Sequence, residues 1–164
     1  MTSVSTLRFT AIVIAGALSG CGVAKSAQTA DAQVLLRPDK LVWAPARSLP
    51  PGAQSVVLDG DPSKPALFTV RLTIPANFRI PPHKHPGTER LTVLSGSIFL
   101  GYGETFDRQN SLYLPAGSYA VNPAGVSHFS WTGEEAVVQL TAMGPWVLEY
   151  VDPKDDPRAR DAAH

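Results

Sequence analysis

The chain is poor in cysteine and in charge. Its 164 residues contain one cysteine, only 17% are charged, and the formal net charge is zero. A lone cysteine excludes an internal disulfide framework. Clustered lysine and arginine are also missing, which argues against nucleic acid as a partner, because phosphate neutralisation needs such clusters. Apolar residues make up 44% of the chain, enough for a core, so length and composition indicate one domain with appendages.

A long hydrophobic run is missing as well. Arg8 precedes the apolar stretch 9–18, which is shorter than the roughly 20 residues that span a bilayer. A positive start before a short apolar run is typical of a secretory signal. The run ends in Leu18-Ser19-Gly20-Cys21, which resembles the lipobox of bacterial lipoproteins. The resemblance implies a signal peptide over 1–20, a lipid on Cys21, and a periplasmic protein held to a bacterial membrane by that lipid alone.

Two other interpretations of the N-terminus stay open. Ordinary secretion would cut after a sequence such as Ala30-Asp31-Ala32. A cytosolic protein would bury the stretch as a helix, although no amphipathic pattern supports this. Residues 22–34 are small and polar, so we expect a flexible tether over 21–39.

Short β-rich runs separated by turn residues fill the rest of the chain. The 13 glycines and 15 prolines are spread throughout, and no stretch after the signal keeps helical periodicity for three turns. We therefore predict an all-β, antiparallel domain over 40–152, followed by a polar tail, 153–164, that frays. The expected strands are 66–74, 90–94, 97–102, 111–114, 118–121, 126–131, 136–142 and 146–151.

Three of the four histidines form a set with one glutamate. His83 and His85 are two apart, so a strand would direct both to one face. The turn 86–88 brings Glu89 back, and His128 can close the site from a neighbouring strand. Imidazole and carboxylate suit one divalent ion of Fe, Mn, Zn, Ni or Cu. The alternative is a pair of solvated turn histidines beside a surface glutamate.

The spacing around these residues resembles the cupin superfamily. His83-Lys84-His85, Glu89 and Gly96 meet its first motif, while Gly117, Pro123-Ala124-Gly125 and His128 meet its second. Asn77 and Thr132 depart from it, standing where the family usually has glycine and asparagine. The resemblance implies a cupin-type jelly-roll β-barrel with the metal inside, held by His83, His85, Glu89 and His128, and a homodimer.

Alternation along the strands predicts the wall of the pocket. Phe129 and Trp131 would face away from His128, where core or interface packing is expected. No further carboxylate, lysine or arginine is placed by motif to act as a general base, so the chemistry would be centred on the metal. The candidate lining residues are Leu91, Val93, Phe99, Tyr113, Val126, Ser130, Gln139 and Met143.

Two classes of function follow from these residues. Three histidines and one carboxylate leave a six-coordinate ion two open positions, which suits a mononuclear metal enzyme acting on a small chelating organic molecule. By resemblance, cupins with this ligand set are often dioxygenases or decarboxylases. The alternative is a non-catalytic ligand carrier or sensor, because the segment 116–125 resembles the cupin half of zinc-binding anti-sigma factors. An exported lipoprotein would not meet a cytoplasmic sigma factor. A metal-free structural barrel is the third possibility.

Overall fold

A computed structural model describes residues 33–161 of the chain. The predicted signal peptide, the lipid site at Cys21 and most of the predicted tether lie outside these residues. The described end of the tether contains one short 3-10 helix, η1 (Pro38–Lys40). Within 33–161, no helix is both long and apolar enough to cross a membrane.

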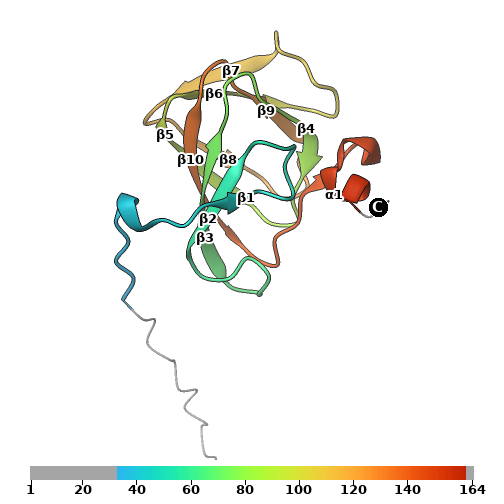
Figure 1. The fold of residues 1–164 in the computed structure, drawn as a ribbon. Coiled ribbons are helices and arrows are strands. Elements are labelled where there is room, and N and C mark those ends of the chain that lie inside the picture. Colours follow the sequence, from blue (N-terminus) through green and yellow to red (C-terminus); the bar gives the residue numbers. More distant parts are fainter. Residues whose placement is uncertain (1–32, 162–164) are drawn as a thin grey trace, which may run out of the picture. The chain divides into compact units, whose positions relative to one another are not determined.

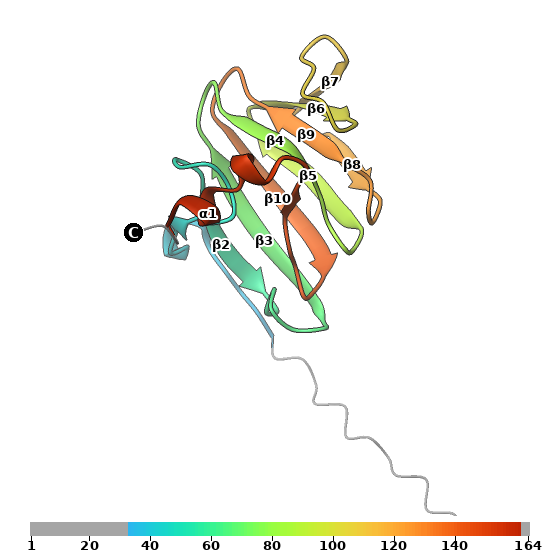
Figure 2. The same ribbon diagram turned by 90° about the vertical axis from the view of Figure 1, so that its right-hand side faces the viewer.

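The described chain is built from two antiparallel sheets, as predicted (Figure 1). One sheet has the order β1-β2-β3-β10-β5-β8 and the other β11-β4-β9-β6-β7. Figure 2 shows β2, β3, β10 and β5 running side by side. This is the all-β jelly-roll arrangement. The strands are β1 (Ala44–Pro45), β2 (Gln54–Asp59), β3 (Leu67–Ile74), β4 (Arg79–Lys84), β5 (Glu89–Ser95), β6 (Ser97–Tyr102), β7 (Ser111–Pro115), β8 (Tyr119–Asn122), β9 (His128–Trp131), β10 (Ala136–Met143) and β11 (Glu149–Tyr150).

The alternating burial of side chains along β10 shows which face of its sheet points into the core. Val138 and Leu140 are buried, whereas Gln139 and Thr141 between them are only partly covered. Successive residues of a strand point to opposite faces, so the apolar set of β10 lines the space between the sheets. The same rule buries Ile98 and Leu100 of β6 from the opposite sheet. The two sheets thereby enclose the core.

The two departures from the cupin motifs meet at one turn between β3 and β4. Asn77 has a φ of 56°, and it is the only residue other than glycine with positive φ among those described. Asparagine tolerates this left-handed conformation better than most residues, so it can stand where glycine is usual. The Thr132 hydroxyl donates to the Pro75 carbonyl at 2.6 Å and accepts from the Phe78 amide at 3.0 Å. Thr132 therefore fastens this turn to the end of β9.

The segment after β10 contains β11, which lies within the expected strand 146–151. The described part of the polar tail expected over 153–164 contains the 3-10 helix η2 (Pro153–Asp155) and the short helix α1 (Pro157–Asp161). The Tyr150 hydroxyl donates to the Ser48 carbonyl at 2.8 Å, and the Arg158 guanidinium donates to the Leu148 carbonyl at 2.7 Å. The first bond ties β11 to the stretch after β1, and the second ties α1 to the chain just before β11. Charge and proline content gave no sign of either bond.

Candidate metal centre

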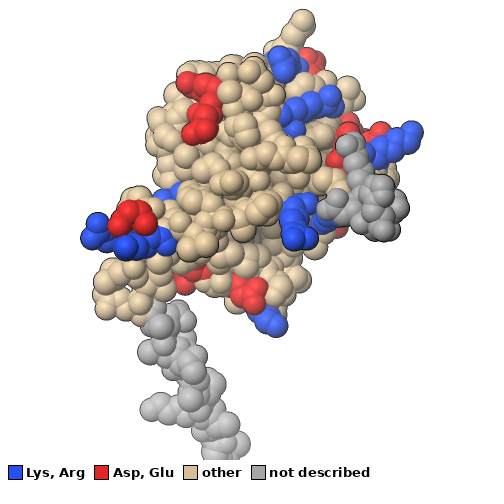
Figure 3. Space-filling model, viewed as in Figure 1, with Lys and Arg blue, Asp and Glu red and all other residues tan. Residues whose placement is uncertain are grey.

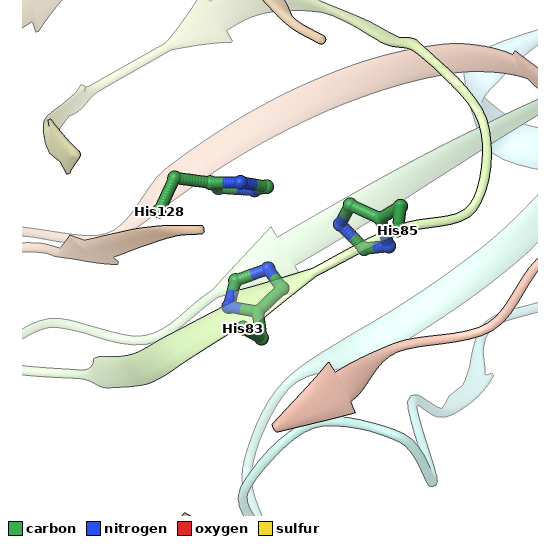
Figure 4. A group of neighbouring side chains, drawn as sticks. All are labelled: His83, His85 and His128. Carbon is green, nitrogen blue, oxygen red and sulfur yellow. The ribbon is translucent and has the colours of Figure 1, made fainter. Parts of the chain in front are cut away.

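Three imidazoles converge inside the domain. His83 lies on β4, His85 directly follows that strand, and His128 is the first residue of β9. Each is at most 5% exposed. One ring nitrogen from each of the three lies within 4.8 Å of the others, and Figure 4 shows the rings facing one another. The prediction that these three histidines come together is confirmed.

Backbone carbonyls fix the orientation of each ring. The Nδ1 atom of His83 lies 2.7 Å from the Pro81 carbonyl oxygen, and that of His85 lies 2.9 Å from the Val147 carbonyl oxygen. His128 Nδ1 lies 3.1 Å from the carbonyl oxygen of the turn residue two before it. A carbonyl oxygen only accepts, so each Nδ1 carries the proton and each Nε2 offers a lone pair. That tautomer is the one a metal ion needs at Nε2.

One of these lone pairs has no partner. The Nε2 atom of His85 is buried and makes no hydrogen bond with any described residue. Buried polar atoms are nearly always satisfied, and an orphan of this kind calls for an explanation such as an ion. A divalent metal bound between the three imidazoles would satisfy it. The donor set and the orphaned atom therefore fit a metal ion.

Glu89 lies beside two of the three histidines. Its Oε2 atom is 3.5 Å from His128 Nε2 and 4.0 Å from His85 Nε2, and the residue is only 5% exposed. The amide of Asn122, its cross-strand partner on β8, donates to the same oxygen at 2.6 Å. The group that converges within 4.8 Å contains the three histidines only. The role of Glu89 as a fourth ligand therefore stays a prediction.

The protonation states are those that metal ligands require. Burial lowers the pKa of His83 to about 3, helped by the neighbouring His128, and burial also lowers the pKa of His85. Burial raises the pKa of Glu89, but the adjacent His128 and His85 and the Asn122 amide outweigh it and lower that pKa to about 2. At neutral pH the site thus combines neutral imidazoles at His83 and His85 with a carboxylate, the forms that bind metals.

Two residues at the site escaped the sequence analysis. Asn122 orients Glu89, and its own carbonyl oxygen accepts from the Tyr102 hydroxyl at 2.9 Å. Trp146 stacks on His85 with ring centroids 3.9 Å apart and planes 17° from parallel. Asn122 stands directly before the second-motif Pro123, which was its only signal in the sequence. Trp146 comes from the segment after β10, whose path the sequence does not reveal.

The metal centre lines a cavity of about 480 Å³ between the sheets, and the part of the wall formed by the three histidines and Glu89 is called the metal end. Leu91 and Ser130 line it, as predicted, and Ser130 shares the inner face of β9 with His128. Most other lining residues are apolar, and one group of them comes from β2, β3 and β10. Within the described chain these include Val57, Phe68, Val70, Leu72, Ile74, Val138 and Leu140.

Six predicted lining residues do not face this cavity, and each prediction was wrong for a local reason. Val93 is buried in the core, outside the cavity wall, and Gln139 bonds to Arg71 on the outer face of its sheet. Val126 precedes β9, so its alternation with His128 does not hold. The remaining three point outward or end a strand: Phe99, which stacks on Trp131 with centroids 3.8 Å apart, Tyr113, which is 56% exposed, and Met143, which is 53% exposed.

Comparison with known proteins places this site in a family context. The chain is 31% identical to germin-like protein 3-1 of Oryza sativa subsp. japonica over 102 residues, which cover 62% of this chain and 41% of that protein. Matches to other germin-like proteins also span only a part of their length, for example 34%.

Solved structures share the fold at low sequence identity. The polyketide cyclase RemF from Streptomyces resistomycificus matches with a TM-score of 0.65 and 18% identity, covering 80% of this chain and 94% of that one. An acetylacetone dioxygenase from Acinetobacter johnsonii matches with a TM-score of 0.60 and 20% identity, covering 78% and 83%. A family model, the ChrR cupin-like domain, matches residues 31–147. Because that match covers well over half of the chain, the protein belongs to the ChrR cupin-like domain family.

Proposed function

We propose that the protein is a metal-dependent enzyme that uses one divalent ion to act on a small chelating organic molecule, in the manner of a dioxygenase or a decarboxylase. One observation carries the proposal. Three imidazoles with fixed tautomers, one of them carrying the orphaned Nε2 atom of His85, converge in the wall of a cavity large enough for a small molecule.

Some residues of the site would hold the ion, and others would shield it from water. His83, His85 and His128 would hold the ion through Nε2, and Glu89 would lower the charge of the site. A bound ion supplies Lewis acidity and open coordination positions for a chelating substrate. The carbonyls that accept from the three Nδ1 atoms keep the rings aligned. The apolar wall excludes water, which strengthens the electrostatic interactions within.

The structural neighbours support a catalytic function without deciding the reaction. One neighbour is an acetylacetone dioxygenase and another a polyketide cyclase, so the same fold houses enzymes that act on organic molecules. Likeness at this level of identity concerns the fold. The reaction is therefore proposed from the site itself.

A carrier or sensor is the second candidate, and the composition of the cavity favours it. Apart from Glu89 and the three histidines, the described lining holds no group that would take up a proton at neutral pH. Such a cavity can hold a ligand on the metal without transforming it. Tightly held zinc with no turnover under any metal would identify the protein as this binder.

We also propose an exported, lipid-anchored protein that forms a homodimer. The proposal of export depends on the short apolar run and the lipobox-like sequence before Cys21. Replacing Cys21→Ser should move the protein from the membrane fraction to the soluble fraction of the periplasm. Sedimentation of the lipid-free domain should give the mass of two chains. A soluble wild-type protein or a monomer at micromolar concentration would refute the corresponding part.

The test of the enzymatic proposal is metal reconstitution. Protein stripped of metal is assayed with a panel of β-diketones, catechols and oxalate-like acids, before and after addition of Fe²⁺ or Mn²⁺. We expect turnover only with metal, and none for His85→Ala. Lys84→Ala is the matched control, since the exposed Lys84 makes only a surface ion pair with Glu149 at 3.8 Å. Turnover retained in His85→Ala, or absent across the panel with every metal, would contradict the proposal.

A further inference from the structure

The wall of the cavity carries very few charges. Its charged lining residues, besides the histidines, are Glu89, Arg47 and Arg158. Arg158 is already paired, because its guanidinium donates to the Asp156 carboxylate at 2.8 Å and to the Leu148 carbonyl at 2.7 Å. Arg47 belongs to the stretch after β1 and is exposed. No lysine occurs among the described lining residues. Among the described lining residues, the only cation besides the paired Arg158 is therefore the exposed Arg47.

This composition sets the charge of an ion-loaded site. The three histidines donate through Nδ1 to carbonyls and contribute no charge as ligands, while the Glu89 carboxylate, which accepts from the Asn122 amide, contributes one negative charge. With a divalent ion, the centre carries a net charge of +1. An uncompensated charge in an apolar cavity is costly. A ligand with one negative charge neutralises the centre. A dianion leaves one negative charge in the cavity, and the only cation besides the paired Arg158 in the described lining is the exposed Arg47, whose charge is screened by water.

The apolar part of the cavity wall favours ligands with an apolar body. Val70, Leu72 and Leu140 line the cavity from β3 and β10, and Trp146 borders the metal end from the segment after β10. Apolar surface that a ligand buries there contributes about 25 cal/mol per Å². A volume of about 480 Å³ lies within the range of small-molecule sites. A compact polar acid would leave most of this space without a partner.

We propose that the site selects chelators that carry a single negative charge and an apolar body, in preference to small doubly charged acids. An aryl-substituted β-diketone bound as its enolate belongs to the favoured class, and oxalate belongs to the disfavoured one. This inference rests on the proposed function, because it assumes that the metal centre and the cavity act on one ligand.

Binding to the zinc-loaded protein tests the inference without any turnover. Benzoylacetone and oxalate are titrated into it by calorimetry and by quenching of tryptophan fluorescence, with Trp146→Phe identifying the signal that comes from the cavity. We expect benzoylacetone to bind roughly 100-fold more tightly than oxalate. Acetylacetone, which offers the same two oxygens without the ring, should fall between them.

A positive charge introduced into the cavity wall should reduce the preference for benzoylacetone over oxalate. Ser55 of β2 lines the cavity and is half-buried, whereas its neighbour Gln54 is exposed and does not line it. Ser55→Lys adds a cation to the wall of β2 and should narrow the ratio of the two affinities roughly 10-fold. Gln54→Lys, the matched control on the same strand, should leave the ratio unchanged.

The outcomes separate this inference from the proposed function. Zinc-loaded protein that binds oxalate as tightly as benzoylacetone overturns the inference and leaves a metal site standing. Wild-type protein that takes up no metal overturns both. Benzoylacetone binding without turnover under Fe²⁺ or Mn²⁺ supports the inference and removes catalysis. If Ser55→Lys does not fold, the wild-type ratio alone decides.

Discussion

Two parts of the cavity wall are built in different ways. At the metal end, single hydrogen bonds position each group: carbonyl oxygens fix the rings of His83, His85 and His128, and Asn122 fixes Glu89. In the apolar part from β3 and β10, the wall depends on strand alternation and on side-chain volume. We therefore expect substitutions at the metal end to lower metal affinity more than stability. Substitutions in the apolar part of the wall should lower stability more than metal affinity.

The largest effect on stability should come from the wall. Leu140 is 5% exposed and packs with Phe68 and Val70, so Leu140→Ala removes buried contacts beside an existing cavity. We expect the free energy of unfolding to fall by about 2–5 kcal/mol, measured by urea denaturation. Metal stoichiometry should not change. Leu112→Ala is the control, because Leu112 is 68% exposed and its loss should cost less than about 0.5 kcal/mol.

At the metal end, the largest effect outside the histidines is expected at Asn122. Asn122→Ala removes the amide that donates to Glu89 at 2.6 Å, which frees the carboxylate to rotate. Metal affinity should fall roughly 10–100-fold, measured by competition with a coloured chelator. Asn110→Ala serves as the control, since Asn110 is exposed and its side chain bonds only to Asp107. An unchanged metal affinity in Asn122→Ala would show that Glu89 takes no part in binding.

Lowering the pH should destabilise the metal-free protein, because residues of the metal end change protonation on unfolding. Burial lowers the pKa of His83 to about 3 from 6.5. Between these values the unfolded chain holds a proton that the folded chain does not, so the free energy of unfolding falls as the pH drops below 6.5. Glu89, with its pKa lowered from 4.5 to about 2, adds a loss in the same direction below pH 4.5.

A variant isolates the contribution of His83 to this loss of stability in acid. Between pH 8 and pH 5, the wild type should lose about 2 kcal/mol more than His83→Gln, which cannot titrate in this range. Urea denaturation of both proteins at the two pH values measures the difference. Parallel losses in the two proteins would mean that His83 is not held neutral by burial.

The smallest effect on stability should appear at the turn between β3 and β4, which does not line the cavity. Asn77 has a φ of 56°, so Asn77→Ala should cost about 1 kcal/mol. Asn77→Gly should change the stability by less than about 0.5 kcal/mol, because glycine adopts this conformation freely. Thermal unfolding compares the two variants. A larger loss in the glycine variant would refute the conformational explanation.

The sequence predicted the metal end better than the wall. The spacing of His83, His85 and His128 brought the correct residues together, because motif spacing and strand geometry are local properties. Strand positions were also predictable: the expected run 97–102 is β6, and 136–142 lies within β10. Such runs are marked by turn residues on both sides.

Residues that depend on the path of distant segments were not predictable. Trp146 reaches His85 only because the segment after β10 passes the metal end, and no periodicity encodes that path. Gln139 was a different kind of error. Its neighbours Val138 and Leu140 are the apolar set of β10, so the alternation already indicated that Gln139 faces outward. Val126 failed because it lies in a turn, where alternation does not apply.

The most direct test of the metal centre is a metal titration of the purified, metal-stripped protein. We predict one divalent ion per chain for the wild type and for Glu104→Gln, an exposed control. His128→Ala should lose more than about 100-fold in affinity, beyond the range expected for residues that only orient a ligand. A wild-type protein that binds no ion, or a His128→Ala variant that binds as tightly as the wild type, would contradict the account.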